Sequence, residues 1–273
     1  MHASRLLVLA LCLTALLPAA SAAQTDPSTV PELTIDRPGF TESSDVVGRG
    51  FVQFEMGTSY EGSGQDASRD RIFTAPLALM RVGVSKRVEL RFSTDGYMMD
   101  TYGLGAAHAV TRGQTDLEVG AKFVVLDRSR RVQLALIPMA SLPTGKAGVT
   151  SGTVDPTLKC TWSADLPRGF DVSGNVNIER LGDDIGRYTE SALTFSLGKG
   201  LGERWGAYWE AFGFLPKGRP GNAAWTVDSG ITRTFGSNLQ LDVEVGRGIT
   251  AAAPDWFISG GIGLRTAPFR GRR

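Results

Sequence analysis

Side chains that could carry covalent chemistry are scarce in this sequence, which has 2 His and 2 Cys among 273 residues. One of each, His2 and Cys12, lies in the N-terminal region that we expect to be removed. A lipid hydrolase, the main enzymatic alternative, needs a nucleophilic Ser with a general base within hydrogen-bond reach. His108 is the candidate base, but it lies in the predicted loop 95–113 and the spacing pairs no Ser with it. We therefore predict that the protein is not an enzyme.

Two other kinds of motif resemble ligand sites but lack the structural context that such sites need. The glycine-rich stretches 103–105 and 260–263 resemble phosphate-binding loops, yet neither begins a helix. Glycines within strands more often allow curvature or leave room in a lumen. Cys160 is the single mature cysteine, which excludes an intrachain disulfide and any Cys/His metal cluster. We predict no metal and no cofactor.

The N-terminus has the pattern of a secretory signal peptide, which we assign to residues 1–23. Arg5 gives the positive start, residues 6–17 form the apolar run, and residues 20–23 offer a small-residue cleavage site. This signal predicts export through the inner membrane. The whole chain has 29 basic and 28 acidic residues. Because this charge balance lacks a basic surplus, it argues against nucleic acid as a partner.

After the first 48 residues the sequence alternates between apolar and polar residues with the period of a β-strand. In one segment, for example, Val176 and Ile178 share one face, whereas Asn175 and Asn177 share the other. Twelve segments alternate in this way: 51–60, 71–84, 88–94, 114–126, 132–142, 154–165, 170–180, 188–199, 205–214, 224–234, 239–248 and 256–265. Most are about ten residues long, which suits a tilted strand that crosses a bilayer.

The connections between these segments alternate in length. The tight connections are 85–87, 127–131, 166–169, 200–204 and 235–238. The connections between them are mostly longer: 61–70, 95–113, 143–153, 181–187, 215–223 and 249–255. Tight turns at one end and longer loops at the other are typical of an outer-membrane barrel.

A soluble antiparallel sandwich would also alternate, so the composition of the polar face decides between the two folds. That face is rich in Gly, Ser, Asn and charged residues, which suits a water-filled lumen. Aromatic residues lie toward the ends of the apolar faces, as expected for interfacial girdles: Tyr60, Trp162, Phe170, Trp205, Trp225 and Trp256. We predict an all-β protein, a transmembrane antiparallel up-and-down β-barrel of about 12 strands over residues 50–266.

Charged residues of the polar faces are the candidate pore lining. They are Glu55, Arg81, Glu89, Arg91, Asp116, Glu118, Lys122, Lys159, Asp171, Glu179, Glu190, Glu210, Asp228, Asp242 and Glu244. Acids outnumber bases in this set by eleven to four. We therefore expect the pore to favour cations, because a narrow low-dielectric channel concentrates the field of its wall charges.

The segment 24–49 precedes the first strand and is too polar and too interrupted by proline to be a strand itself. Two roles are open for it. It could be a disordered periplasmic tail, or it could fold back at Pro38 and plug the lumen. In the second case Asp36, Arg37 and Glu42 would pair with charged residues of the wall.

Several stretches together resemble a known family: residues 34–43, 84–91, 142–145, 238–242, 245–248 and 253–257. Their order and spacing are similar to those of the phenol-degradation meta-pathway outer-membrane transporter family, which is related to the secretion pore for functional amyloid. The resemblance covers residues 34–265. It implies a twelve-stranded barrel, allows a homotrimer, and implies a segment before the barrel that can plug it. The chain departs from many outer-membrane barrels in ending on a basic tail, residues 267–273, rather than on an aromatic residue.

These observations predict a passive channel or transporter in the outer membrane, with membrane lipid and a small-molecule solute as its partners. The resemblance implies that this solute is a small hydrophobic or aromatic compound. A polypeptide export pore and a non-conducting structural or binding barrel are the alternatives that the sequence leaves open.

Overall fold

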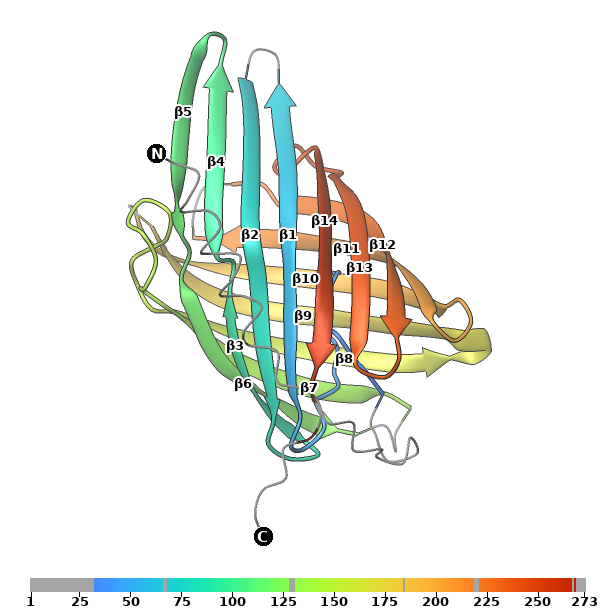
Figure 1. Cartoon of the computed structure of the whole chain (residues 1–273). Coiled ribbons are helices and arrows are strands. Elements are labelled where there is room, and N and C mark those ends of the chain that lie inside the picture. Colours follow the sequence, from blue (N-terminus) through green and yellow to red (C-terminus); the bar gives the residue numbers. More distant parts are fainter. Residues whose placement is uncertain are drawn as a thin grey trace, which may run out of the picture. The chain divides into compact units, whose positions relative to one another are not determined.

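The computed structural model describes residues 32–65, 68–127, 131–183, 185–218, 221–266 and 268. The predicted signal peptide and nearly all of the predicted basic tail lie outside these residues. The described strands join in one antiparallel sheet, and this sheet closes because β1 pairs with both β2 and β14 (Figure 1). No described helix is long and apolar enough to cross a membrane.

In chain order, the strands are β1 (Val52–Gln65), β2 (Ser68–Gly83), β3 (Val88–Thr94), β4 (Tyr97–Leu104), β5 (Ala107–Gln114), β6 (Leu117–Leu126), β7 (Gln133–Leu142), β8 (Asp155–Leu166), β9 (Phe170–Asp183), β10 (Gly186–Gly200), β11 (Trp205–Lys217), β12 (Ala224–Phe235), β13 (Leu239–Gly248) and β14 (Trp256–Arg265). A 3₁₀ turn, η2 (Pro167–Gly169), connects β8 to β9.

The closed barrel has twelve strands, as the sequence predicts: β1 to β3 and β6 to β14. β2 pairs with β3 over residues 78–83 and with β4 over residues 68–75, so β3 and β4 follow one another along the same neighbour. β6 pairs with β3 and β5 pairs with β4 in the same manner. The β4–β5 hairpin is therefore a pair of extra strands, and it lies beside the upper half of β2 in Figure 1.

The prediction of long loops at this end of the barrel is wrong in three places. The stretch 95–113 is mostly the β4–β5 hairpin, β1 and β2 continue through much of 61–70, and β9 and β10 continue into 181–187. The added ends of β1, β2, β9 and β10 are mainly polar on both faces, and β4 has apolar residues on both faces, for example Met98 and Met99, so none of these parts alternates. Beyond the bilayer neither face of a strand needs to be apolar, which accounts for the missing signal.

The two faces of the wall have opposite character. On β1, Gln53 and Glu55 are 1% and 0% exposed, whereas Phe54 and Met56 on the other face are 39% and 48% exposed. On β9, Asn175 is buried and Val176 is exposed, in agreement with the predicted faces. A soluble sandwich would bury its apolar side chains, because apolar surface left in water costs about 25 cal/mol per Å². Here lipid covers the apolar face, and the polar face encloses a lumen.

Candidate functional site

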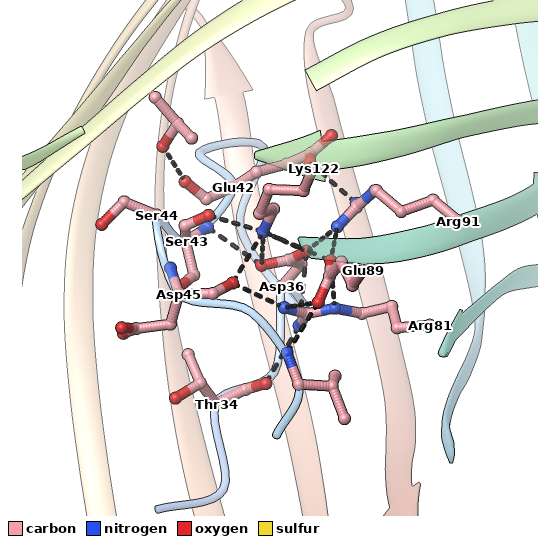
Figure 2. Close-up of polar contacts among 12 residues, drawn as sticks. Thr34, Asp36, Glu42, Ser43, Ser44, Asp45, Arg81, Glu89, Arg91 and Lys122 are labelled. Atoms are coloured by element: carbon pink, nitrogen blue, oxygen red, sulfur yellow. Dashed lines mark hydrogen bonds and ion pairs between the residues drawn. The ribbon is translucent and has the colours of Figure 1, made fainter. Parts of the chain in front are cut away.

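The functional site is built around residues 32–51, which we call the lumenal segment. It has no helix or strand, and it contacts the inner face of the barrel on several strands (Figure 2). Asp36 lies at the centre of these contacts. Its carboxylate is 2.7 Å from Arg91, 3.2 Å from Lys122 and 3.4 Å from Arg81, on β3, β6 and β2. One side chain of the segment thus binds three strands.

Asp36 stays ionised in this position. Burial alone would raise the pKa of Asp36, because a carboxylate loses hydration in the interior. The positive charges of Arg81, Lys122 and Arg91 outweigh burial and hold the pKa well below its ordinary value. The electrostatic pairing therefore persists throughout the neutral and mildly acidic range.

Two carboxylates of the wall complete the charge balance of this cluster. Arg81 is 2.9 Å from Glu89 and 3.2 Å from Glu55, and all three side chains are fully buried. The same guanidinium donates to the backbone carbonyls of Thr34, at 3.0 Å, and Asp45, at 2.8 Å. Arg81 therefore binds the wall and two points of the lumenal segment at once.

Glu42 forms a second connection from the segment to the wall. Its carboxylate is 2.7 Å from Arg91 and 2.5 Å from Lys159, which lies on β8. Thr161, also on β8, donates its hydroxyl to the Glu42 carbonyl at 2.5 Å. Burial raises the pKa of Glu42, but the charges of Arg91 and Lys159 outweigh it and lower the pKa to about 2.

Backbone carbonyls directly after Glu42 are also bound by the wall. Lys122 donates to the carbonyl of Ser43 at 2.6 Å, and Gln133 of β7 donates to that of Ser44 at 2.8 Å. Ser44 is fully buried. These bonds satisfy backbone groups of an irregular segment that would otherwise be buried without partners.

Arg37 extends in the other direction around the wall, across β1 to β14 and β13. It donates to Asp242 at 3.3 Å and to Ser259 at 3.0 Å. Its guanidinium occupies a slot between the paired glycines Gly57 and Gly261, since a Cβ at either position would lie within 2.4 Å of it. The glycine-rich stretch near residue 260 thus makes room for an arginine, as the sequence analysis allows for lumenal glycines.

The turn after Arg37 rests on β11. Backbone N–H groups of Phe40 and Thr41 both donate to the Glu210 carboxylate, at 2.6 Å each. The Phe40 ring stacks on Phe212 with 5.0 Å between centroids and meets Phe214 edge-on at 5.1 Å. A small aromatic patch therefore exists inside the lumen, beside its charged groups.

The predicted pore-lining residues fall into two groups. Those that contact the lumenal segment are Glu55, Arg81, Glu89, Arg91, Lys122, Lys159, Glu210 and Asp242. The others are Asp116, Glu118, Asp171, Glu179, Glu190, Asp228 and Glu244. Of these, Asp116 accepts from the backbone N–H of Gly145 and so anchors an adjoining loop, and Asp171 is exposed at the start of β9. That these side chains line a conducting path stays a prediction.

The four predicted basic residues all lie on β2, β3, β6 and β8, facing Asp36 and Glu42. The acids of β11 to β13 lie on another part of the wall, and there Arg37 is the cation that the lumenal segment supplies. Neutral residues that bind the lumenal segment, such as Gln133 and Thr161, were not among the predicted residues, which are all charged. Their position on the polar face of each strand was the available signal.

The remaining chemical candidates do not join this site. His108 is exposed on β5, within the hairpin rather than in a loop. Cys160 is a half-buried free thiol on β8. Neither contributes to the contacts of the lumenal segment among the described residues.

A closed antiparallel barrel with an apolar outer face and a polar, partly filled lumen defines a transmembrane β-barrel of the outer membrane. The chain belongs to the family described as "Putative MetA-pathway of phenol degradation", whose sequence profile matches residues 35–266.

Solved structures with a similar fold include the COG4313 outer membrane channel from Pseudomonas putida F1, with a TM-score of 0.58 and 12% identity over 84% of this chain and 99% of that one. The translocator domain of autotransporter NalP from Neisseria meningitidis has a TM-score of 0.55 and 13% identity over 80% of this chain and 89% of that one. The NanC porin has a TM-score of 0.51 and 7% identity over 78% of this chain and 98% of that one. No curated protein sequence matches the chain.

Proposed function

We propose that the protein is a passive outer-membrane channel for small hydrophobic or aromatic compounds, and that its lumenal segment narrows the path. The observation that carries this proposal is the pairing of Asp36 with Arg81, Arg91 and Lys122. This pairing keeps the segment inside the barrel, where it occupies space that a solute would use. The function requires no covalent chemistry.

The size of the barrel supports a channel. An eight-stranded barrel is just wide enough for its own side chains, whereas barrels of 16 to 18 strands leave an aqueous channel. A twelve-stranded wall lies between these limits, so its lumen is wide enough to hold a peptide segment. The sheet is closed and has no free edge, which allows the polar interior to exist within hydrocarbon.

The choice of solute rests on the aromatic patch and on the family. Phe40, Phe212 and Phe214 form a mutually packed cluster, with 5.9 Å between the last two rings. Such faces attract planar aromatic molecules through stacking and edge contacts. The description of the family refers to phenol degradation, which agrees with a small aromatic solute. A homotrimeric assembly, allowed by the family resemblance, stays a prediction.

Single-channel recording in a planar bilayer tests the channel and the role of the segment together. The mature chain and a variant lacking residues 31–47 are refolded, and heat-modifiable gel migration verifies that each barrel has folded. We expect well-defined conductance steps that become larger in the deletion variant. Equal conductance in two folded proteins would contradict the narrowing role, and silence in both would favour a structural or binding barrel.

A further inference from the structure

Three carboxylates gather on the lumenal face of β11, β12 and β13. Glu210 is directly opposite Asp228 in the ladder between β11 and β12, and Glu244 pairs with Gly230, the next inward position on β12. One oxygen of each carboxylate lies within 4.8 Å of the others. The three residues are 4%, 7% and 5% exposed, so water covers little of this charge.

The charge of this group is not balanced by the protein in the way that Asp36 is. Among the described residues, no Lys or Arg forms an ion pair with any of the three. Glu210 has two backbone N–H donors from the lumenal segment. Both carboxylate oxygens of Asp228 are buried without a hydrogen-bond partner. A buried ionised carboxylate without a partner is strongly unfavourable, so either protons or a bound cation must neutralise this group.

The donor set and its spacing favour calcium. Calcium binds carboxylate and neutral oxygens at 2.3–2.6 Å in flexible geometry, so ligand oxygens up to about 5 Å apart can share one ion. Tyr208 adds a neutral oxygen, since its hydroxyl is buried without a well-formed hydrogen bond and lies against Gly230, the inward position next to Asp228 on β12. Magnesium fits less well, because it retains several waters in rigid octahedral geometry.

We propose that Glu210, Asp228 and Glu244, with the Tyr208 hydroxyl, form a calcium site on the lumenal wall. Calcium bridges β11, β12 and β13 there and neutralises the acids that the basic residues of β2 to β8 do not reach. Glu210 is shared between this site and the lumenal segment, so the ion fixes the carboxylate on which Phe40 and Thr41 rest. Calcium binding does not depend on conduction and can be measured without it.

Terbium luminescence provides the test, because Tb³⁺ replaces Ca²⁺ and is excited through a nearby Tyr such as Tyr208. The mature chain, refolded in detergent without lipopolysaccharide and stripped with chelator, is titrated with Tb³⁺ and then with Ca²⁺. We expect one saturable emission that Ca²⁺ displaces. Asp228→Asn should weaken it at least about tenfold, since even outer-shell partners of metal sites contribute that much.

The matched control is Glu179→Gln, which removes another inward acid of the wall, bonded to Thr157 at 2.9 Å. It should bind Tb³⁺ as the unmodified protein does. Glu244→Gln serves in place of Asp228→Asn if the latter fails to show heat-modifiable migration. Absence of saturable, Ca²⁺-displaced emission from the unmodified protein would overturn the proposal and indicate shared protons instead. Unchanged binding in a folded Asp228→Asn or Glu244→Gln variant would also overturn it.

Discussion

Replacing Asp36 by Asn is the most direct perturbation of the lumenal segment. The substitution keeps the size of the side chain and the backbone N–H that donates to Glu55 at 2.9 Å. It removes the negative charge that lies within 3.4 Å of Arg81, Arg91 and Lys122. The three cations then keep the wall carboxylates as partners, and Arg81 and Lys122 lose their carboxylate partner on the segment, whereas Arg91 still pairs with Glu42.

The expected magnitude follows from the burial of the cluster. Asp36 and its three cations are at most 4% exposed at their side chains. Removing one partner from a buried ion pair costs about 3–5 kcal/mol, because the remaining charge is uncompensated. At about 1.4 kcal/mol per tenfold change, the undocked fraction of the segment should rise roughly a hundredfold to a few thousandfold.

Thiol labelling measures this fraction. Ser44 is fully buried, so Ser44→Cys in a Cys160→Ala background reports exposure of the segment through its rate of reaction with a maleimide. We expect Asp36→Asn to accelerate labelling by about the factor above. Glu32→Gln is the matched control, because its exposed side chain forms no such pair. Equal labelling rates in Asp36→Asn and Glu32→Gln would refute the reasoning.

Three further results are expected. Docking lowers the pKa of Glu42 to about 2 and also lowers that of Asp36, so docking is fully stabilised only above the ordinary pKa values of these carboxyls, 4.5 and 3.8, and weakens as the pH falls below them. Because the thiolate is the form that reacts, the labelling rate at position 44 is divided by that of a small free thiol at the same pH. This ratio should be flat between pH 5 and 7 and should rise below pH 4. Val243→Arg on the lipid face should lower the free energy of unfolding by about 2–4 kcal/mol, measured by urea titration in lipid vesicles. Ile185→Arg, in an exposed loop, should change this free energy little. Similar values for both variants would mean that the faces of the wall are assigned incorrectly. Reversal potentials in a salt gradient should indicate cation preference, because the lumenal bases are bound by acids and a surplus of wall acids is left, and an anion preference would contradict this charge distribution.

The wall of the barrel could be predicted well because lipid and lumen impose alternation on each strand independently. Val176 and Asn175, for example, can be assigned to opposite faces from their own residue types, and no information on the neighbouring strands is required. Strand ends could not be predicted, since past the bilayer β1 and β2 are polar on both faces. The β4–β5 hairpin was missed because the apolar residues of β4 lie on both of its faces, so the strand does not alternate.

The site could be predicted only in part. Asp36, Arg37 and Glu42 were identified as candidates from their charge beside Pro38, but their partners depend on the closed barrel. Asp36 and Lys122 are 86 residues apart in sequence. No local pattern reports such a pairing, because it requires the register of the intervening strands. The acidic group on β11 to β13 is assembled in the same way, so no local pattern in the sequence indicates it.

The position of the lumenal segment has a consequence for the order of assembly. The segment leads directly into β1, and β1 also pairs with β14, the last strand of the chain. The cations that bind Asp36 and Glu42 all lie on β2 to β8, away from β14. A sheet in which the seam between β1 and β14 is still open therefore already holds the strongest partners of the segment. The segment is enclosed by the closing wall and has no need to thread into a finished barrel.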